Sequence, residues 1–180
     1  QYDMEFERRM DVTEEEYLEM IRLKTSVLLA CALRIGAILG GASEEDAQAL
    51  YAYGEKVGLA FQLQDDYLDV YGDFKTFGKA IGGDILCNKK TFMLINALAH
   101  APRDLKAGLE RWLLAQSFDP QEKIAAVRDI YTRVGVDRMA KERIASYIAQ
   151  AEAILGEVAL PEERKAVLRQ WTGQLLGREK

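Results

Sequence analysis

The chain has 180 residues, of which 49% are hydrophobic, and this is enough apolar material for a globular domain with a sizeable core. Its formal net charge of -5 gives no overall basic field, which argues against a nucleic-acid partner. The longest apolar stretches, such as SVLLACAL at residues 26–33, fall well short of the roughly 20 residues that a membrane span requires. The two cysteines, Cys31 and Cys87, have no CxxC spacing, so we expect neither a disulfide nor a zinc site, and we expect a cytoplasmic protein.

Start and stop signals along the chain predict a protein that is almost entirely helical. Three prolines occur in 180 residues, and no long alternation of apolar and polar β-branched residues is present. Thr13 and Glu16 have the spacing of a capping box, and Asp119 precedes a proline at a first helical position. The predicted helices span residues 13–39, 44–71, 89–100, 103–116, 120–133, 136–155 and 161–176. We therefore predict an all-α fold, an antiparallel helical bundle that forms a single domain over residues 1–180.

Lys24 interrupts an apolar face of the first predicted helix. The positions that share this face are Tyr17, Met20, Ile21, Val27, Leu28, Cys31 and Ile35. A lysine that points inward requires an anion, whereas a lysine at the edge of a core extends its stem over apolar neighbours. The adjacent Thr25 offers a hydroxyl donor, although a helical threonine often bonds to its own backbone.

Three aspartates lie near the end of the second predicted helix, in the stretch FQLQDDYLDVYGD at residues 61–73. Asp65 continues an apolar stripe along this helix, Asp69 lies one turn beyond it, and Asp66 lies about 100° around the helix from Asp65. Two carboxylates about 6 Å apart repel by roughly 2 to 3 kcal/mol at an effective dielectric constant of ~20. If these side chains are buried, hard oxygen ligands favour Mg²⁺, with Mn²⁺ as an alternative. If they are exposed, they form a solvated acidic face.

The connection at residues 72–88 is longer than helical bundles usually need, which is typical of a lid or a binding loop. It contains four glycines, and four lysines lie in it or directly after it: Lys75, Lys79, Lys89 and Lys90. Backbone N–H groups at the start of the next helix could join these lysines around a phosphate, although each lysine alone fits a solvated patch. Together, the aspartates, Lys24 and this connection predict a site for a polyphosphate held through divalent ions.

These segments resemble the trans-isoprenyl diphosphate synthases, also called polyprenyl synthetases, over nearly the whole chain. FQLQDDYLD is similar to the second aspartate-rich motif of the family, Lys24 and Thr25 to its diphosphate-binding pair, and GKAIGGDILCNKKT at residues 78–91 to its lysine-bearing loop. The segment GVDRMAKERIASYIAQAEAIL and the ending GREK have a weaker similarity. The resemblance implies the isoprenoid synthase type of helical bundle.

One part of the family pattern is not found in these 180 residues. Family members carry a first aspartate-rich motif, DDxxD, upstream of the lysine–threonine pair, whereas DDxxD occurs here once, at residues 65–69. We therefore expect that the chain is the C-terminal portion of a family member, with the N-terminal helices of the bundle missing, and that it is inactive alone.

The resemblance implies an enzyme that transfers an allylic chain from its diphosphate to isopentenyl diphosphate, and a homodimer. It implies Mg²⁺ bound by Asp65, Asp66 and Asp69. It implies that Lys24 and Lys79 are catalytic and that the diphosphate is bound by Lys24, Thr25, Gln62, Lys79 and Lys89. His100, the single histidine, is expected to be structural or exposed rather than a catalytic base.

Three alternatives remain open at this point. A class I terpene cyclase uses related aspartate motifs on the same fold, but usually carries an NSE-like triad that is not found here. A non-catalytic subunit of a heteromeric synthase keeps the fold, but tends to lose the aspartates. A helical interaction domain would carry a solvated acidic stripe and would not respond to Mg²⁺ or to a bisphosphonate.

Overall fold

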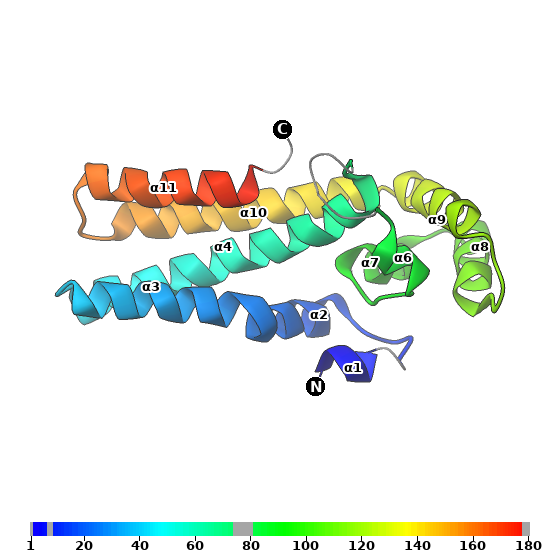
Figure 1. The fold of residues 1–180 in the computed structure, drawn as a ribbon, viewed down its shortest axis with the longest axis horizontal. Helices are drawn as coiled ribbons and strands as arrows, with labels where there is room; N and C mark the ends of the chain where they lie inside the picture. Colours follow the sequence, from blue (N-terminus) through cyan, green and yellow to red (C-terminus); the bar gives the residue numbers. More distant parts are fainter. Residues whose placement is uncertain (1, 7–8, 74–80, 178–180) are drawn as a thin grey trace. The chain divides into compact units, whose positions relative to one another are not determined.

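The computed structural model describes residues 2–6, 9–73 and 81–177, and within these ranges its regular structure is helical, without a strand (Figure 1). The elements are α1 (Tyr2–Phe6), α2 (Glu14–Ile21), η1 (Arg22–Ser26), α3 (Val27–Leu39), α4 (Glu44–Tyr71), α6 (Gly83–Leu86), α7 (Phe92–His100), α8 (Arg103–Leu114), α9 (Pro120–Val134), α10 (Val136–Glu157) and α11 (Glu162–Leu176). The all-α prediction is confirmed. Of the helices in the described ranges, none combines the length and the apolar character that crossing a membrane requires.

The predicted capping residues act as their spacing indicates. The N–H of Glu16 donates to Thr13 Oγ1 at 3.2 Å, and the N–H of Thr13 donates to Glu16 Oε2 at 2.9 Å, which is a reciprocal capping box. Asp119 Oδ1 accepts from the N–H groups of Gln121 and Glu122, both at 2.9 Å. The bounds of α4 agree with the prediction, and the other six predicted helices are found with changed ends or internal structure. The short helices α1 and α6 were not predicted.

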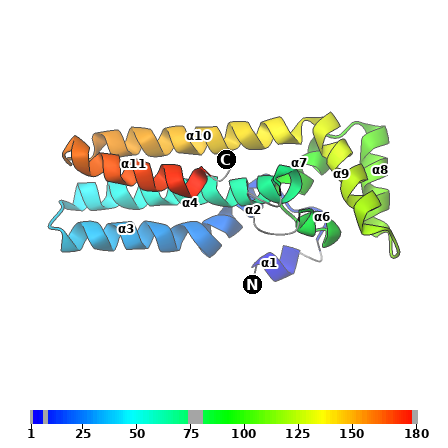
Figure 2. The same cartoon turned by 45° about the horizontal axis from the view of Figure 1, so that its top comes forward.

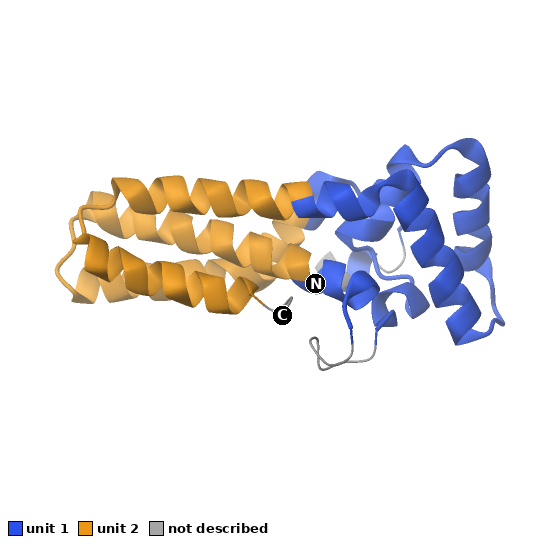
Figure 3. Cartoon of the chain, turned by 90° about the horizontal axis from the view of Figure 1, so that it is seen from above, with its two compact units in different colours: residues 1–17, 65–141 blue, residues 18–64, 142–180 orange. Residues whose placement is uncertain are grey.

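The chain divides into two compact units that share long helices (Figure 3). Unit 1 comprises residues 1–17 and 65–141, and unit 2 comprises residues 18–64 and 142–180. The helices α4 and α10 each contribute residues to both units. The prediction of one domain over residues 1–180 is not tested by this division and stays a prediction.

In unit 2, α3, the first part of α4, the second part of α10, and α11 lie side by side, and the end of α2 and η1 lead into α3 (Figure 2). Its core contains the buried residues Leu50, Tyr53, Val57, Ala151, Leu155 and Val158. Partly buried apolar side chains of α3 and α11 pack against this core, including Leu33 and Leu168. Helices joined by short connections alternate in direction, as expected for an antiparallel bundle.

The first predicted helix contains a π-helical turn, η1, that the sequence did not predict. The N–H of Val27 bonds to the carbonyl of Arg22, five residues earlier, so this turn holds one more residue than an α turn. Residues after it are therefore rotated by about 100° relative to the predicted face. Ser26 and Ala30 are buried, whereas Leu28 is 77% exposed. Lys24 lies within this turn and is exposed, whereas the sequence had left open whether it points inward or lies at the edge of the core.

A close approach between η1 and α4 depends on Gly58. A Cβ atom at this position would lie 2.6 Å from Ser26 Cα, which is a backbone atom. We expect Gly58→Ala to lower the free energy of unfolding by about 1 to 3 kcal/mol, because an overpacked core forces the backbone to move. Gly36→Ala is the matched control, because a Cβ at Gly36 in α3 would meet nothing within 4 Å.

The control should raise the free energy of unfolding by about 0.5 to 1 kcal/mol, the gain from alanine over glycine inside a helix. Urea denaturation of both variants measures the difference. Equal stabilisation by the two substitutions would contradict tight packing at Gly58.

Unit 1 is organised around α9, which contacts α6, α7 and α8. Its buried residues Val127, Ile130 and Tyr131 recur at helical spacing and face this packing. Gly82, at the start of α6, has a φ angle of 86°, and a Cβ there would lie 2.7 Å from the Ile124 side chain of α9. The position thus requires glycine both for its backbone conformation and for its contact with α9.

Candidate functional site

The three aspartates of α4 differ in burial. Asp66 is 3% exposed and is the most buried of them, whereas Asp65 and Asp69 are intermediate. The apolar stripe read from the sequence includes Asp65 and leaves Asp66 to its side, whereas in the structure Asp66 is the more buried of the two. Near its end α4 is buried on several sides, since Leu63, Leu68 and Val70 are also buried, and one stripe does not describe it.

Asp66 is held by a buried hydrogen bond within unit 1. The hydroxyl of Tyr17, on α2, donates to Asp66 Oδ2. Burial raises the pKa of the Asp66 carboxyl to about 7, although the Tyr17 hydrogen bond and the charge of Lys89 act in the opposite direction. Burial and the Asp66 charge likewise raise the pKa of the Tyr17 hydroxyl, which therefore remains a donor at neutral pH.

Asp69 holds the start of α6 against the end of α4. Its Oδ2 accepts from the N–H of Asp84 at 3.0 Å, and its backbone carbonyl accepts from the N–H of Gly82 at 2.7 Å. Burial raises the pKa of Asp69, and the hydrogen bond from the Asp84 backbone opposes this effect. The GGD sequence at residues 82–84 thus contacts the end of α4 through backbone N–H groups.

Asp84, whose backbone bonds to Asp69, also binds Lys89 through its side chain. The ammonium of Lys89 donates to Asp84 Oδ1 at 3.1 Å and to Oδ2 at 3.3 Å, and the side chains are 39% and 21% exposed. The backbone N–H of Lys89 also donates to the carbonyl of Asp84 at 3.0 Å. Unit 1 therefore brings the predicted residues Asp69 and Lys89 together through Asp84, which the sequence analysis had not named.

In unit 2, Thr25 and Gln62 lie in direct contact. The hydroxyl of Thr25 donates to Gln62 Oε1 at 3.1 Å. It therefore bonds to a residue of α4, in contrast to the common bond of a helical threonine to its own backbone. Lys24 and Thr25 both belong to the π turn η1, and such turns occur frequently at functional sites. Two of the predicted diphosphate-binding residues are thus brought together, and the exposed Lys24 is adjacent to one of them in the chain.

Two predicted lysines of the glycine-containing connection, Lys75 and Lys79, lie outside the described residues. That connection is described at residues 72–73 and 81–88. It enters the short helix α6 and then a turn at Asn88, whose φ angle is 51°.

The predicted metal ligands offer carboxylate oxygens, which are the donors that Mg²⁺ prefers. Among the described residues, however, no group of three or more His, Cys, Asp or Glu side chains is placed to hold a metal ion. Asp66 is engaged by Tyr17, and Asp69 is engaged by the Asp84 backbone. Asp65 and Asp69 are partly exposed and are therefore better placed to reach a cation than the buried Asp66.

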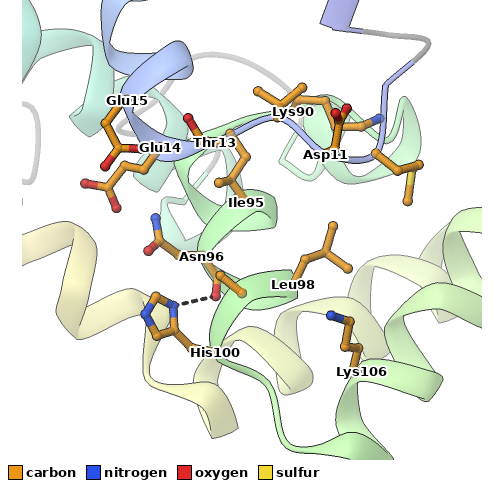
Figure 4. A pocket seen from close by; sticks show the side chains of 13 residues that line it. Asp11, Thr13, Glu14, Glu15, Lys90, Ile95, Asn96, Leu98, His100 and Lys106 are labelled. Atoms are coloured by element: carbon orange, nitrogen blue, oxygen red, sulfur yellow. Dashed lines mark hydrogen bonds between the residues drawn. The ribbon is translucent and has the colours of Figure 1, made fainter.

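Unit 1 also contains a pocket of about 450 Å³ that is lined by Lys90 but by none of the residues predicted to bind metal or diphosphate (Figure 4). It is lined by the segment before α2 and by α7 and α8, including Thr13, Asn96 and Lys106. His100 borders it, is exposed and bonds through Nδ1 to the carbonyl of Asn96 at 3.0 Å, in agreement with the structural or exposed role predicted for it.

Two residues at the aspartate end of α4 had weak signals in the sequence. Tyr17 occupies a position in an apolar helix face and was assigned to the core, so its hydroxyl gave no separate signal. Asp84 follows two glycines directly, and a carboxylate after a tight turn is a recognisable candidate for a lysine partner.

Comparison with known proteins identifies the family. The polyprenyl synthetase family model matches residues 1–131. A short chain isoprenyl diphosphate synthase of Methanothermobacter thermautotrophicus is 40% identical over 176 residues, which cover 89% of this chain and 53% of that protein. A geranylgeranyl diphosphate synthase of Methanosarcina mazei is 40% identical over 178 residues, which cover 98% of this chain and 52% of that protein.

Solved structures agree with this result. A geranylgeranyl pyrophosphate synthase matches with a TM-score of 0.91 and 39% identity, covering 99% of this chain and 56% of that chain. A geranylgeranyl pyrophosphate synthase from Corynebacterium glutamicum, complexed with isoprenyl diphosphate and magnesium, matches with a TM-score of 0.88 and 29% identity, covering 98% of this chain and 50% of that chain. The fold is thus of the isoprenoid synthase type, and the chain spans about half the length of the relatives it matches. The chain belongs to the polyprenyl synthetase family, as its DDYLD motif and lysine–threonine pair had indicated.

Proposed function

We propose that the intact protein is a prenyltransferase that condenses an allylic diphosphate with isopentenyl diphosphate in isoprenoid biosynthesis. In this reaction the C1–oxygen bond of the allylic substrate breaks and diphosphate leaves. C4 of isopentenyl diphosphate then bonds to C1, and a proton is lost from C2. The observation that carries the proposal is the end of α4, where Asp69 accepts from the backbone of Asp84 and Asp84 accepts from Lys89.

We propose Mg²⁺ as the cofactor, with Mn²⁺ as an alternative, held by Asp65, Asp66 and Asp69. A bound divalent ion neutralises the negative charge that develops on the leaving diphosphate. Asp65 and Asp69, which are partly exposed, would hold the ion directly or through its waters, together with Asp66. The Tyr17 hydroxyl holds the Asp66 carboxyl in place, and the Asp84 backbone N–H holds that of Asp69. The magnesium in the Corynebacterium glutamicum relative supports this assignment.

We propose that the allylic diphosphate is bound by lysines and by the Thr25–Gln62 pair. Lys24 and Lys79 place fixed positive charge on the leaving group, which lowers the barrier to ionisation, and Lys89 binds the same diphosphate. Gln62 accepts the hydroxyl of Thr25, which leaves the amide N–H donors of Gln62 to turn toward a phosphate oxygen.

We propose further that the protein is cytoplasmic and forms a homodimer, and that residues 1–180 are inactive without a second aspartate-rich motif. DDxxD occurs once in this sequence, so the chain supplies one of the two carboxylate clusters that the family pattern uses. An equimolar mixture with a polypeptide that carries the other cluster should restore turnover if both parts fold.

Product formation tests the proposed function directly. Protein expressed from the complete gene is incubated with labelled isopentenyl diphosphate and with dimethylallyl, geranyl or farnesyl diphosphate. We expect prenyl diphosphates lengthened by five carbons in the presence of Mg²⁺ and none with excess EDTA. Folded protein that incorporates no label with any of the three would contradict the proposal, and cyclic hydrocarbons formed from an allylic diphosphate alone would identify a terpene cyclase instead.

A further inference from the structure

Lys123, on α9, is a fully buried lysine that has no role in the proposed reaction. Its side chain is 0% exposed, and its ammonium donates to Asn88 Oδ1 at 2.7 Å and lies 3.5 Å from the carbonyl of Leu86. The ring of Phe118 covers it, with the ammonium 4.2 Å from the ring centroid. Among the described residues the Lys123 ammonium contacts neutral oxygens and an aromatic ring, and forms no ion pair with a carboxylate.

Asn88 is the point at which this lysine acts on the chain. Its φ angle of 51° lies in the left-handed region, which asparagine adopts more readily than most residues. Its side-chain amide donates to the carbonyl of Leu113 at 3.1 Å, in addition to accepting from Lys123. Its backbone N–H donates to Ile85, and its carbonyl accepts from Lys90 at 3.2 Å. All four polar groups of Asn88 are therefore engaged.

This turn leads directly into the candidate site. Asn88 immediately precedes Lys89, whose ammonium donates to Asp84, and Asp84 donates its N–H to Asp69 on α4. A change in the φ angle of Asn88 would redirect Lys89, because the two residues share a peptide bond. The Lys123 ammonium and the Leu113 carbonyl thus bind the two ends of the Asn88 side-chain amide. They hold Asn88 in place, and the backbone of Asn88 sets the direction of Lys89.

The composition of this contact argues against simple packing. Burying an ammonium costs free energy unless it is well paired, and an apolar side chain of similar volume would fill the space without that cost. Burial lowers the pKa of Lys123 accordingly. Filling the core therefore does not explain a charged side chain at this position. Holding the Asn88 side chain in its orientation does explain it.

We infer that Lys123 and Asn88 are positioning residues, which hold Lys89 in the orientation that binds diphosphate. The inference rests on the proposed function of Lys89. It predicts that Lys123 affects the reaction only through Lys89, and the effects of the two residues must then be non-additive.

A double-mutant cycle on the intact protein tests this coupling. The variants are Lys123→Met, which keeps the volume of the stem, Lys89→Met, and the combination. We expect Lys123→Met to lower kcat/KM by about 10-fold, and the double variant to be no worse than Lys89→Met alone. Asn88→Ala should reproduce the effect of Lys123→Met without removing a charge. Losses in kcat/KM that multiply in the double variant would overturn the inference.

Lys165→Met is the matched control. Lys165 is also buried, at 5% exposed, and donates to the carbonyl of Gly156 at 2.9 Å near the end of α10. Its replacement should change stability while kcat and KM stay within about 2-fold of the wild-type values. An equal loss of kcat/KM in Lys165→Met and Lys123→Met would assign both effects to stability and would contradict a positioning role.

Hydrogen exchange gives a second measurement that does not depend on activity. In Lys123→Met, the amides of Asn88 and Lys89 should exchange at least about 10-fold faster than in the wild type, while the amides of α11 exchange at an unchanged rate. Unchanged exchange at Asn88 would overturn the inference even if the wild type is an active prenyltransferase. Faster exchange in a protein without prenyltransferase activity would support Lys123 and Asn88 as positioning residues for Lys89. It would reject only the proposed function.

Discussion

Replacing Asp65 with alanine should lower the turnover of the intact protein at least ~100-fold. This is the scale for removing one preorganised group that stabilises charge in the transition state. Asp65 and Asp69 are the two partly exposed aspartates of the DDYLD motif, and Asp69 also accepts a hydrogen bond from the Asp84 backbone. Steady-state kinetics at saturating Mg²⁺ measure the effect. Asp65→Asn should show a similar loss, because the amide keeps the size and removes the charge.

Glu45→Gln provides the control for this experiment. Glu45 is an exposed carboxylate in the first turn of the same helix, and its neutralisation removes a charge far along the sequence from the motif. It should leave turnover within about 2-fold of the wild-type value. Near-normal turnover in Asp65→Ala would refute the metal assignment.

A second large effect is expected in the pH dependence of stability. Burial raises the pKa of Asp66 from 3.8 to about 7, so between these pH values the folded protein binds a proton that the unfolded chain has released. The contribution of Asp66 to the free energy of unfolding therefore decreases as pH rises from about 4 to 7, and is constant above that. At about 1.4 kcal/mol per pKa unit, the full effect is on the order of 4 kcal/mol.

Asp66→Asn removes this pH dependence, because an amide does not titrate and still accepts the hydroxyl of Tyr17. Without Mg²⁺, the melting temperature of the variant relative to the wild type should be higher at pH 8 than at pH 5. Calorimetry at the two pH values measures this difference. Asp129→Asn, at an exposed position of α9, should show no such change, and an Asp66→Asn difference that is the same at both pH values would contradict the buried carboxylate.

The sequence predicted most of the fold because capping residues and glycines act locally. The boundaries of α4 and the capping box of Thr13 depend on neighbouring residues, so they could be read from the chain. The π turn at Arg22–Ser26 could not, because no residue pattern in the chain marks the extra residue, and the close approach of Ser26 to Gly58 of α4 is a long-range contact. The extra residue rotates the positions that follow it, so Ala30 is buried and Leu28 is exposed.

The sequence predicted which residues belong to the candidate site. It did not predict most of the contacts between them. Thr25 and Gln62 were both proposed as diphosphate ligands, and they lie 3.1 Å apart. The partner of Asp66, by contrast, is Tyr17, which is 49 residues away in the sequence. Lys123 lies four residues before the buried Val127, on the same face of α9. In the sequence, only this interruption of an apolar face indicated that Lys123 is buried. Such long-range pairs depend on how helices pack, which periodicity does not determine.

The central claim is that the carboxylates at the end of α4 recognise a diphosphate through a divalent ion. Isothermal titration of the intact protein with inorganic pyrophosphate, with and without Mg²⁺, tests it most directly. The account predicts saturable binding with Mg²⁺, at least about 10-fold weaker binding with EDTA, and loss of the Mg²⁺ effect in Asp65→Ala. Pyrophosphate binding of equal affinity with and without Mg²⁺ would contradict it.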